Sequence, residues 1–135
     1  MKRLILTVGL PRSGKSTWAK EQGHPIVNRD AIRLALHGKA YIMDAEPMVT
    51  AIEDYMVRSL FLAGHSTVIV DACHVTQKRR ERWVNPMWII EWRIIDTRKG
   101  ICIQRAWNDD REDLIPIIES MWKDCDIPEI RSIQC

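Results

Sequence analysis

The sequence predicts an α/β fold in which helices cover both faces of a doubly wound, mostly parallel sheet, giving three layers. Two observations lead to this prediction. Short apolar segments alternate about four times with segments of helical apolar spacing, and turn residues separate them. A glycine-rich loop lies between the first apolar segment and the first helical one, where parallel sheets bind ligands. The 135 residues suit one domain, which we expect to span residues 1–135.

Composition places the chain among soluble globular proteins, because 46% of its residues are hydrophobic and 28% are charged. No apolar run reaches the length of a membrane span, and Gly9 and Pro11 interrupt the N-terminal apolar stretch before it could form a secretory signal. A cytoplasmic location is therefore expected. The net charge of +2 is too small to indicate a nucleic-acid binder, although a local basic patch is compatible with it.

The cysteines show no C-x-x-C pair and no zinc spacing. We expect all four to be thiols, several of them buried: Cys73, Cys102, Cys125 and Cys135.

Residues 9–17, Gly-Leu-Pro-Arg-Ser-Gly-Lys-Ser-Thr, match the P-loop pattern G-x-x-x-x-G-K-[ST] at every fixed position. Glycines let the backbone turn so that successive N–H groups point at nucleotide phosphates. Lys15 should reach the β- and γ-phosphates, and the Ser16 hydroxyl should bind Mg²⁺. The residues expected to bind the nucleotide are Gly9, Pro11, Arg12, Ser13, Gly14, Lys15, Ser16 and Thr17.

The surroundings of this loop support the assignment. The apolar run 3–8 before it suits a buried parallel strand, and residues 16–22 after it suit a helix that Gly23 ends. The helix N-terminus then adds its dipole to the anion site.

Asp30 follows a predicted second strand, residues 24–28, and begins a predicted helix, residues 29–37, with Gly38 as its C-cap. Two interpretations of this carboxylate remain open. Asp30 could cap the helix, or it could accept a proton from an attacking hydroxyl as a general base. Arg33 shares its helix face and could form a surface pair with Asp30 or hold a substrate anion.

A helix over about residues 44–63 shows only core spacing, and the apolar strand 66–71 follows it. That strand ends in Asp71, which has the form of a Walker B carboxylate and would hold Mg²⁺. Next, Thr76 is a candidate N-cap for a helix over residues 77–84. Its first turn carries Arg79 and Arg80, and two interpretations of these arginines remain open. They could lie on a solvated helix face, or they could line the edge of the site and contact substrate phosphate.

The last third of the chain predicts a buried strand over residues 88–96, helices over 100–107 and 114–122, and an edge strand over 127–133. The polar break near residues 108–113 indicates either a plain turn or a lid, residues 105–114. A lid would bring an arginine to the transferred phosphoryl group.

Several stretches together resemble one family. They are residues 9–19, the motif Asn28-Arg29-Asp30-x-x-Arg33, the strand into Asp71-Ala72, the pair Arg79-Arg80, the motif Cys102-x-x-Arg105 and the apolar helix around Met121. Over nearly the whole chain, the sequence is similar to the kinase domain of phage polynucleotide 5′-hydroxyl kinases and related small P-loop kinases.

The resemblance implies an ATP- and Mg²⁺-dependent kinase with Lys15 at the triphosphate. It implies that Asp30 is the general base and that Arg33 holds a phosphate of the acceptor strand. Arg105 or Arg111 would be the lid arginine.

Three features differ from the family pattern. No Asp-x-Asp-Gly-Thr motif is present, so no 3′-phosphatase activity is expected. Cys73-His74 stands where the family often has Thr-Asn, and His74 is the expected acceptor contact there. The two candidate lid arginines are more widely spaced than in the family.

The sequence predicts an enzyme that phosphorylates the 5′-hydroxyl end of DNA or RNA. The same machinery could instead serve a nucleoside, a modified DNA base or another small alcohol. A nucleotide-dependent switch without an acceptor is the third hypothesis. The sequence does not indicate the oligomeric state or choose between ATP and GTP.

Overall fold

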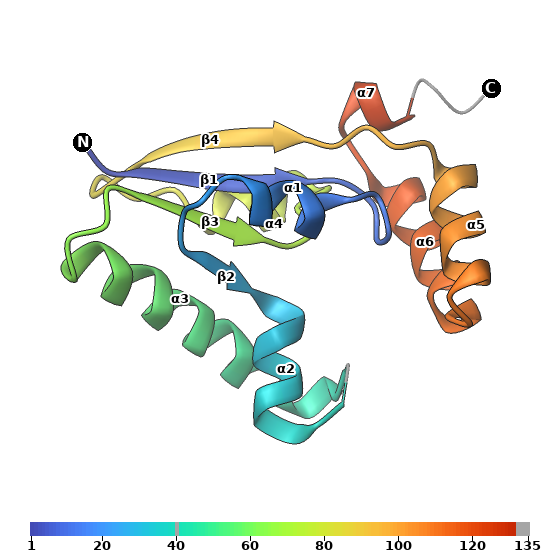
Figure 1. Cartoon of the computed structure of the whole chain (residues 1–135), viewed down its shortest axis with the longest axis horizontal. Coiled ribbons are helices and arrows are strands. Elements are labelled where there is room, and N and C mark those ends of the chain that lie inside the picture. Colours follow the sequence, from blue (N-terminus) through green and yellow to red (C-terminus); the bar gives the residue numbers. More distant parts are fainter. Residues whose placement is uncertain (40, 132–135) are drawn as a thin grey trace.

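The computed structural model describes residues 1–39 and 41–131, and its centre is a fully parallel four-stranded sheet (Figure 1). The strands lie in the order β2-β3-β1-β4 and span Arg3–Val8 (β1), Ile26–Asn28 (β2), Thr67–Asp71 (β3) and Ile89–Ile94 (β4). Each strand lies within a segment that the sequence predicts. The α/β fold class is confirmed.

The helices also follow the predicted alternation. They are α1 (Lys15–Glu21), α2 (Arg29–His37), α3 (Glu46–Leu62), α4 (Gln77–Glu81), α5 (Lys99–Asn108), α6 (Ile115–Asp124) and α7 (Pro128–Arg131), with 3-10 turns η1 (Met43–Ala45) and η2 (Glu112–Leu114). The α2 helix has the predicted bounds and ends at Gly38, whose φ of 68° is left-handed and favours glycine. None of these described helices is long and apolar enough to cross a membrane.

Alternate residues of β1 face opposite layers, as the two-residue period of a strand requires. Leu4 and Leu6 pack with α3 residues and Trp83 in the larger core cluster. Ile5 packs on the opposite face with Ala19 of α1. The helices therefore form layers on both faces of the sheet, as predicted.

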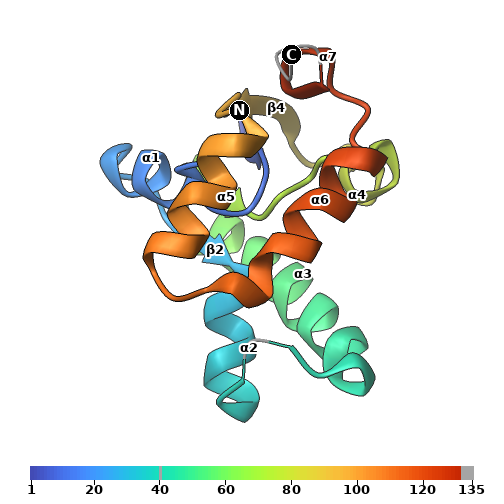
Figure 2. The same ribbon diagram turned by 90° about the vertical axis from the view of Figure 1, so that its right-hand side faces the viewer.

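The α5 and α6 helices form an antiparallel hairpin joined by η2, and they lie side by side at the end of the sheet where the strands end (Figures 1 and 2). A separate apolar cluster joins this hairpin to the P-loop strand, with Val8 and Leu10 packed among Cys102, Ala106 and Ile118. The hairpin is therefore packed beside the carboxyl edge of the sheet.

Two predictions about strands are wrong. The strand near residues 88–96 is an exposed edge strand rather than a buried one: Trp92 is 51% exposed, because β4 has a neighbour on one side alone in the described sheet. The segment predicted as an edge strand over 127–133 begins instead with α7, whose Ile130 is buried. Positions 132 and 133 lie outside the described residues.

Candidate functional site

The loop of residues 9–14 turns sharply between β1 and α1. Gly14 has a φ of 104°, in the left-handed region that favours glycine, and it immediately precedes α1. Gly9 is confined by its neighbours, since an added Cβ would lie 2.7 Å from Ser13 Oγ and 2.9 Å from the Ile95 carbonyl oxygen. The loop thus places the N-terminus of α1, with its unpaired first-turn N–H groups, at the end of the sheet.

Lys15 and Ser16 open α1. The Lys15 side chain is largely buried, and its Nζ donates to the Leu10 carbonyl oxygen at 2.8 Å. The Ser16 hydroxyl donates to Asp71 Oδ2 at 2.6 Å. A cationic amine, a hydroxyl and a helix N-terminus therefore meet in one loop, and this donor set suits a nucleoside triphosphate.

Asp71 ends β3 and is buried, with 4% of its surface exposed. Besides the Ser16 bond, its carboxylate accepts from Asn28 Nδ2 at 2.8 Å and from Thr7 Oγ1 at 3.3 Å. Oxygen ligands of this kind suit Mg²⁺, which commonly takes one or two protein ligands and completes its shell with phosphates and water. Ser16 and Asp71 fit that pattern. Across residues 1–39 and 41–131 no group of three or more His, Cys, Asp or Glu could hold a metal by itself.

Asn28 connects Asp71 to α2, a role that the sequence analysis does not assign to it. Its Nδ2 donates to Asp71, while its Oδ1 accepts from the Ala31 N–H at 2.8 Å and caps α2. The capping interpretation of Asp30 is therefore wrong, because Asn28 is the cap. The sequence held a signal for the cap, because Asn is a preferred N-cap residue and Asn28 directly precedes the predicted helix over residues 29–37. The bond to Asp71 depends on the pairing of β2 with β3, which the sequence does not show.

Asp30 projects from the first turn of α2, and 77% of its side chain is exposed. Arg33 Nη1 donates to Asp30 Oδ1 at 2.8 Å, and Arg33 Nε donates to Glu46 Oε2 at 3.0 Å. The hydrogen bond from Arg33 is the main cause that lowers the pKa of Glu46. Arg33 is thus held by an ionised carboxylate on α3, with one edge of its guanidinium turned toward Asp30.

The two candidate lid arginines lie in different places. Arg105 Nη1 donates to the Arg12 carbonyl oxygen at 3.1 Å, which places it on the P-loop backbone. Arg111 pairs with Asp113 at 3.0 Å. That hydrogen bond raises the pKa of Arg111 most, and the charge of Asp30 adds a smaller effect, so Arg111 and Asp30 are electrostatic neighbours.

The α5–α6 hairpin and the residues that flank α5 also hold the P-loop. Arg12 has a left-handed φ of 66° and pairs with Asp109 at 3.0 Å. Thr97 Oγ1 donates to the Ser13 carbonyl oxygen at 2.7 Å. These contacts reach the loop from the residues on either side of α5, so the position of α5 and the shape of the loop depend on one another.

Arg80 and His74, which the sequence predicts as acceptor contacts, are buried within the fold. Arg80 donates to the His74 carbonyl oxygen at 2.9 Å and pairs with Asp126 at 2.7 Å. Because a carbonyl can only accept, His74 Nδ1 must donate to Thr7 O at 2.7 Å. Burial lowers the pKa of His74 to about 4 and keeps it neutral. The structure does not bring these two residues to Asp30, whereas Arg79 is exposed on α4.

The described cysteines match the prediction of thiols. Cys73, Cys102 and Cys125 are free, and Cys102 and Cys125 are buried. Burial raises the pKa of Cys102 to about 11, so its thiol is protonated and unreactive. Cys135 lies outside the described residues.

Solved structures share this fold. A chain of the Pnkp1/Rnl/Hen1 complex is 26% identical, with a TM-score of 0.68 over 77% of this chain and 38% of that one. A chain of the Pnkp1/Rnl/Hen1 RNA repair complex is 20% identical, with a TM-score of 0.68 over 95% of this chain and 48% of that one. A gluconokinase from Sinorhizobium meliloti 1021 is 19% identical, with a TM-score of 0.56 over 92% and 75% of the two chains.

The match to the chains of the two Pnkp1/Rnl/Hen1 structures covers less than half the length of those chains. A family model described as an AAA domain matches residues 4–114, which include the P-loop, Asp30, Asp71 and both candidate lid arginines. The chain therefore belongs to the AAA domain family, and its parallel sheet and glycine loop give it a P-loop kinase-like fold.

Proposed function

We propose that this protein transfers the γ-phosphoryl group of ATP, in the presence of Mg²⁺, to the 5′-hydroxyl end of DNA or RNA. One observation carries the proposal. An exposed carboxylate, Asp30, stands beside Arg33 at the same sheet edge as the P-loop, and Asn28 connects it to Asp71. A nucleotide switch has no need of a carboxylate and an arginine on the acceptor side.

The triphosphate side is built from α1 and β3. Lys15 and the first-turn N–H groups of α1 bind the phosphate oxygens, and Ser16 with Asp71 would hold Mg²⁺. The metal would neutralise negative charge on the phosphates when bound. Lys15 then exchanges its bond to Leu10 O for a bond to phosphate.

On the acceptor side, Asp30 accepts the proton of the attacking hydroxyl as its oxygen bonds to the γ-phosphorus, and the bond from that phosphorus to the β,γ-bridging oxygen breaks so that ADP leaves. Arg33 holds a phosphate of the acceptor strand, which replaces its contact with Asp30 and frees that carboxylate. Glu46 keeps the guanidinium in place during this exchange. Arg79 on exposed α4 offers a second phosphate contact.

We assign the lid role to Arg111 rather than Arg105. The charge of Asp30 contributes to the raised pKa of Arg111, so the two side chains are near one another. The phosphoryl group is transferred beside that carboxylate, where a lid arginine would be needed. Arg105 is engaged with the P-loop backbone and supports the loop shape.

Similarity to a chain of an RNA repair complex supports a polynucleotide acceptor. Similarity to a gluconokinase keeps a small alcohol as the second candidate. A polynucleotide and a small alcohol would both give their hydroxyl proton to Asp30, so an assay has to identify the acceptor.

The test is transfer of labelled γ-phosphate from ATP to a panel of acceptors. The panel contains 5′-hydroxyl DNA and RNA oligonucleotides, their 5′-phosphorylated controls, hydroxymethylated DNA, nucleosides and gluconate. We expect label on the 5′-hydroxyl oligonucleotides and none on the phosphorylated controls. Label on small acceptors alone would overturn the polynucleotide assignment and retain the kinase.

Asp30→Asn separates catalysis from binding. We expect transfer to fall at least about 100-fold, because the amide cannot accept the proton, while ATP binding is unchanged. Asp124→Asn makes the same chemical change at an exposed position of α6 and should leave transfer unaltered. Near-normal transfer by Asp30→Asn would refute the general-base role.

A further inference from the structure

The outer edge of β4 is an unpaired strand edge in the described part of the chain. Its inner edge bonds to β1, with the Ile89 N–H donating to Lys2 O at 2.9 Å and the Ile95 N–H donating to Val8 O at 2.7 Å. Alternate residues of a strand bond to the same neighbour. The odd-numbered residues 89–95 therefore face β1, and the even-numbered residues present their N–H and C=O groups outward.

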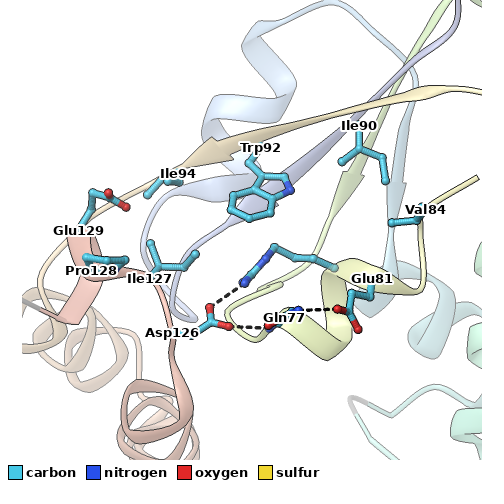
Figure 3. Close-up of a pocket in the computed structure, with 11 residues that line it drawn as sticks. Gln77, Glu81, Val84, Ile90, Trp92, Ile94, Asp126, Ile127, Pro128 and Glu129 are labelled. Carbon is cyan, nitrogen blue, oxygen red and sulfur yellow. Dashed lines mark hydrogen bonds and ion pairs between the residues drawn. The ribbon is translucent and has the colours of Figure 1, made fainter.

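Three apolar residues supply these outward groups: Ile90, Trp92 and Ile94. Their side chains lie on one face of the sheet and line a groove of about 830 Å³, and Figure 3 shows Trp92 projecting over it. Trp92 is 51% exposed and has the Arg80 guanidinium 4.5 Å from its ring centre. An open edge beside an exposed tryptophan is a surface that a further strand would cover.

The opposite face of β4 is charged. Glu91 pairs with Arg3 of β1 at 2.8 Å, and Arg93 lies over the Trp18 ring at 5.3 Å from its centre. Both side chains are exposed. The strand thus carries an acid and a base two positions apart, on either side of Trp92.

We propose that two copies of this chain pair edge to edge through β4, antiparallel, about a two-fold axis at Trp92. Trp92 then opposes the partner's Trp92, and Ile90 opposes the partner's Ile94. These are the residues whose backbone groups point outward, so the strands can exchange hydrogen bonds at each of these pairs. Between them, Glu91 opposes the partner's Arg93, and Arg93 opposes the partner's Glu91.

Charge selects this register. The backbone allows a two-fold centre at any residue of β4, because the even-numbered residues, which turn their bonding groups outward, then pair with even-numbered residues of the partner. A centre at residue 91 would set Glu91 against the partner's Glu91, and a centre at 93 would set Arg93 against the partner's Arg93. A centre at residue 90 would set Glu91 against the partner's Ile89. A centre at 94 would set Arg93 against the partner's Ile95. With the centre at 92, both charged residues meet an opposite charge in close, non-hydrogen-bonded pairs.

The proposal predicts a dimer of the wild-type chain in sedimentation equilibrium at micromolar concentrations. Arg93→Glu would set Glu91 against a glutamate at position 93 of the partner, twice by symmetry. We expect the dissociation constant to rise about tenfold to a hundredfold. Glu91→Arg should weaken the dimer similarly, by placing two arginines opposite two others.

Mixing the two variants is the decisive control. A chain with Glu91→Arg beside a chain with Arg93→Glu restores an opposite charge at both positions, so the mixture should form heterodimers while each variant alone is monomeric. Rescue by mixing excludes misfolding as the cause of the loss. Each variant should also keep wild-type circular dichroism and ATP binding.

A wild-type chain that stays monomeric over the whole concentration range would overturn the proposal. So would a dimer whose dissociation constant is unchanged by both charge reversals, because that dimer would use another surface. Failure of the mixture to associate would refute the register. None of these outcomes bears on the proposed phosphoryl transfer.

Discussion

Asn28 shows how one residue can serve both local structure and the site. Its amide oxygen caps α2, and its amide nitrogen binds the carboxylate of Asp71 on the neighbouring strand. The first contact makes α2 begin where it does, and the second aligns that helix with the P-loop side of the site. Asp30 follows two residues later, so its position depends on both contacts.

We predict that Asn28→Ala lowers the free energy of unfolding by about 1 kcal/mol, through loss of the cap. Phosphoryl transfer should fall at least about tenfold as well, because Asp30 and Asp71 are no longer aligned. Urea unfolding and the transfer assay measure the two effects. Thr76→Ala removes the cap of α4 but no contact to Asp71. This variant should have a lower free energy of unfolding and unchanged phosphoryl transfer. Equal transfer by the two variants would contradict this role of Asn28.

At the scale of elements, a buried carboxylate joins three helical segments. Glu53 of α3 has 1% of its side chain exposed, and its Oε1 pairs with Arg29 of α2 at 2.8 Å. It also pairs with Arg82, next to α4, at 2.7 Å. Arg29 lies between Asn28 and Asp30, so this network holds the start of α2 against α3. An apolar helical pattern over residues 44–63 does not reveal it.

We predict that Glu53→Gln lowers the free energy of unfolding by about 3 kcal/mol, because two guanidinium groups lose their shared buried carboxylate. Asp54→Asn is the matched control. Its pair with Arg82 is at 2.9 Å on an exposed side chain, and its loss should cost at most about 1 kcal/mol. Urea unfolding measures the free energy of unfolding of both variants. Equal decreases in the two variants would show that the Glu53 network does not stabilise the fold.

At the scale of the whole molecule, the nucleotide side joins parts that are distant in the chain. The P-loop follows β1, Asp71 ends β3, and contacts from Thr97, Arg105 and Asp109 hold the loop from the far side. A ligand bound there contacts the folded state alone. Its binding should therefore stabilise the entire domain.

We predict that ATP with Mg²⁺, at 100 times its dissociation constant, raises the free energy of unfolding by about 2.7 kcal/mol. Lys15→Ala should lose most of this gain at the same concentration, because the phosphate loses its cationic partner. Lys20→Ala, on an exposed position of α1, should retain it. Thermal unfolding with and without nucleotide measures the gain. The same stabilisation of both variants would contradict the role given to Lys15.

The sequence by itself determined the order of strands and helices as far as α6, the P-loop and the paired motif of Asp30 and Arg33. These features depend on residues close together in the chain, through periodicity, turn chemistry and motif spacing. The tertiary structure decided what depends on distant residues. It joined Asn28 to Asp71, buried Arg80 on Asp126, and placed β4 at the edge of the sheet. Apolar strands at the centre and at the edge of a sheet have similar patterns, and only the assembled neighbours distinguish them.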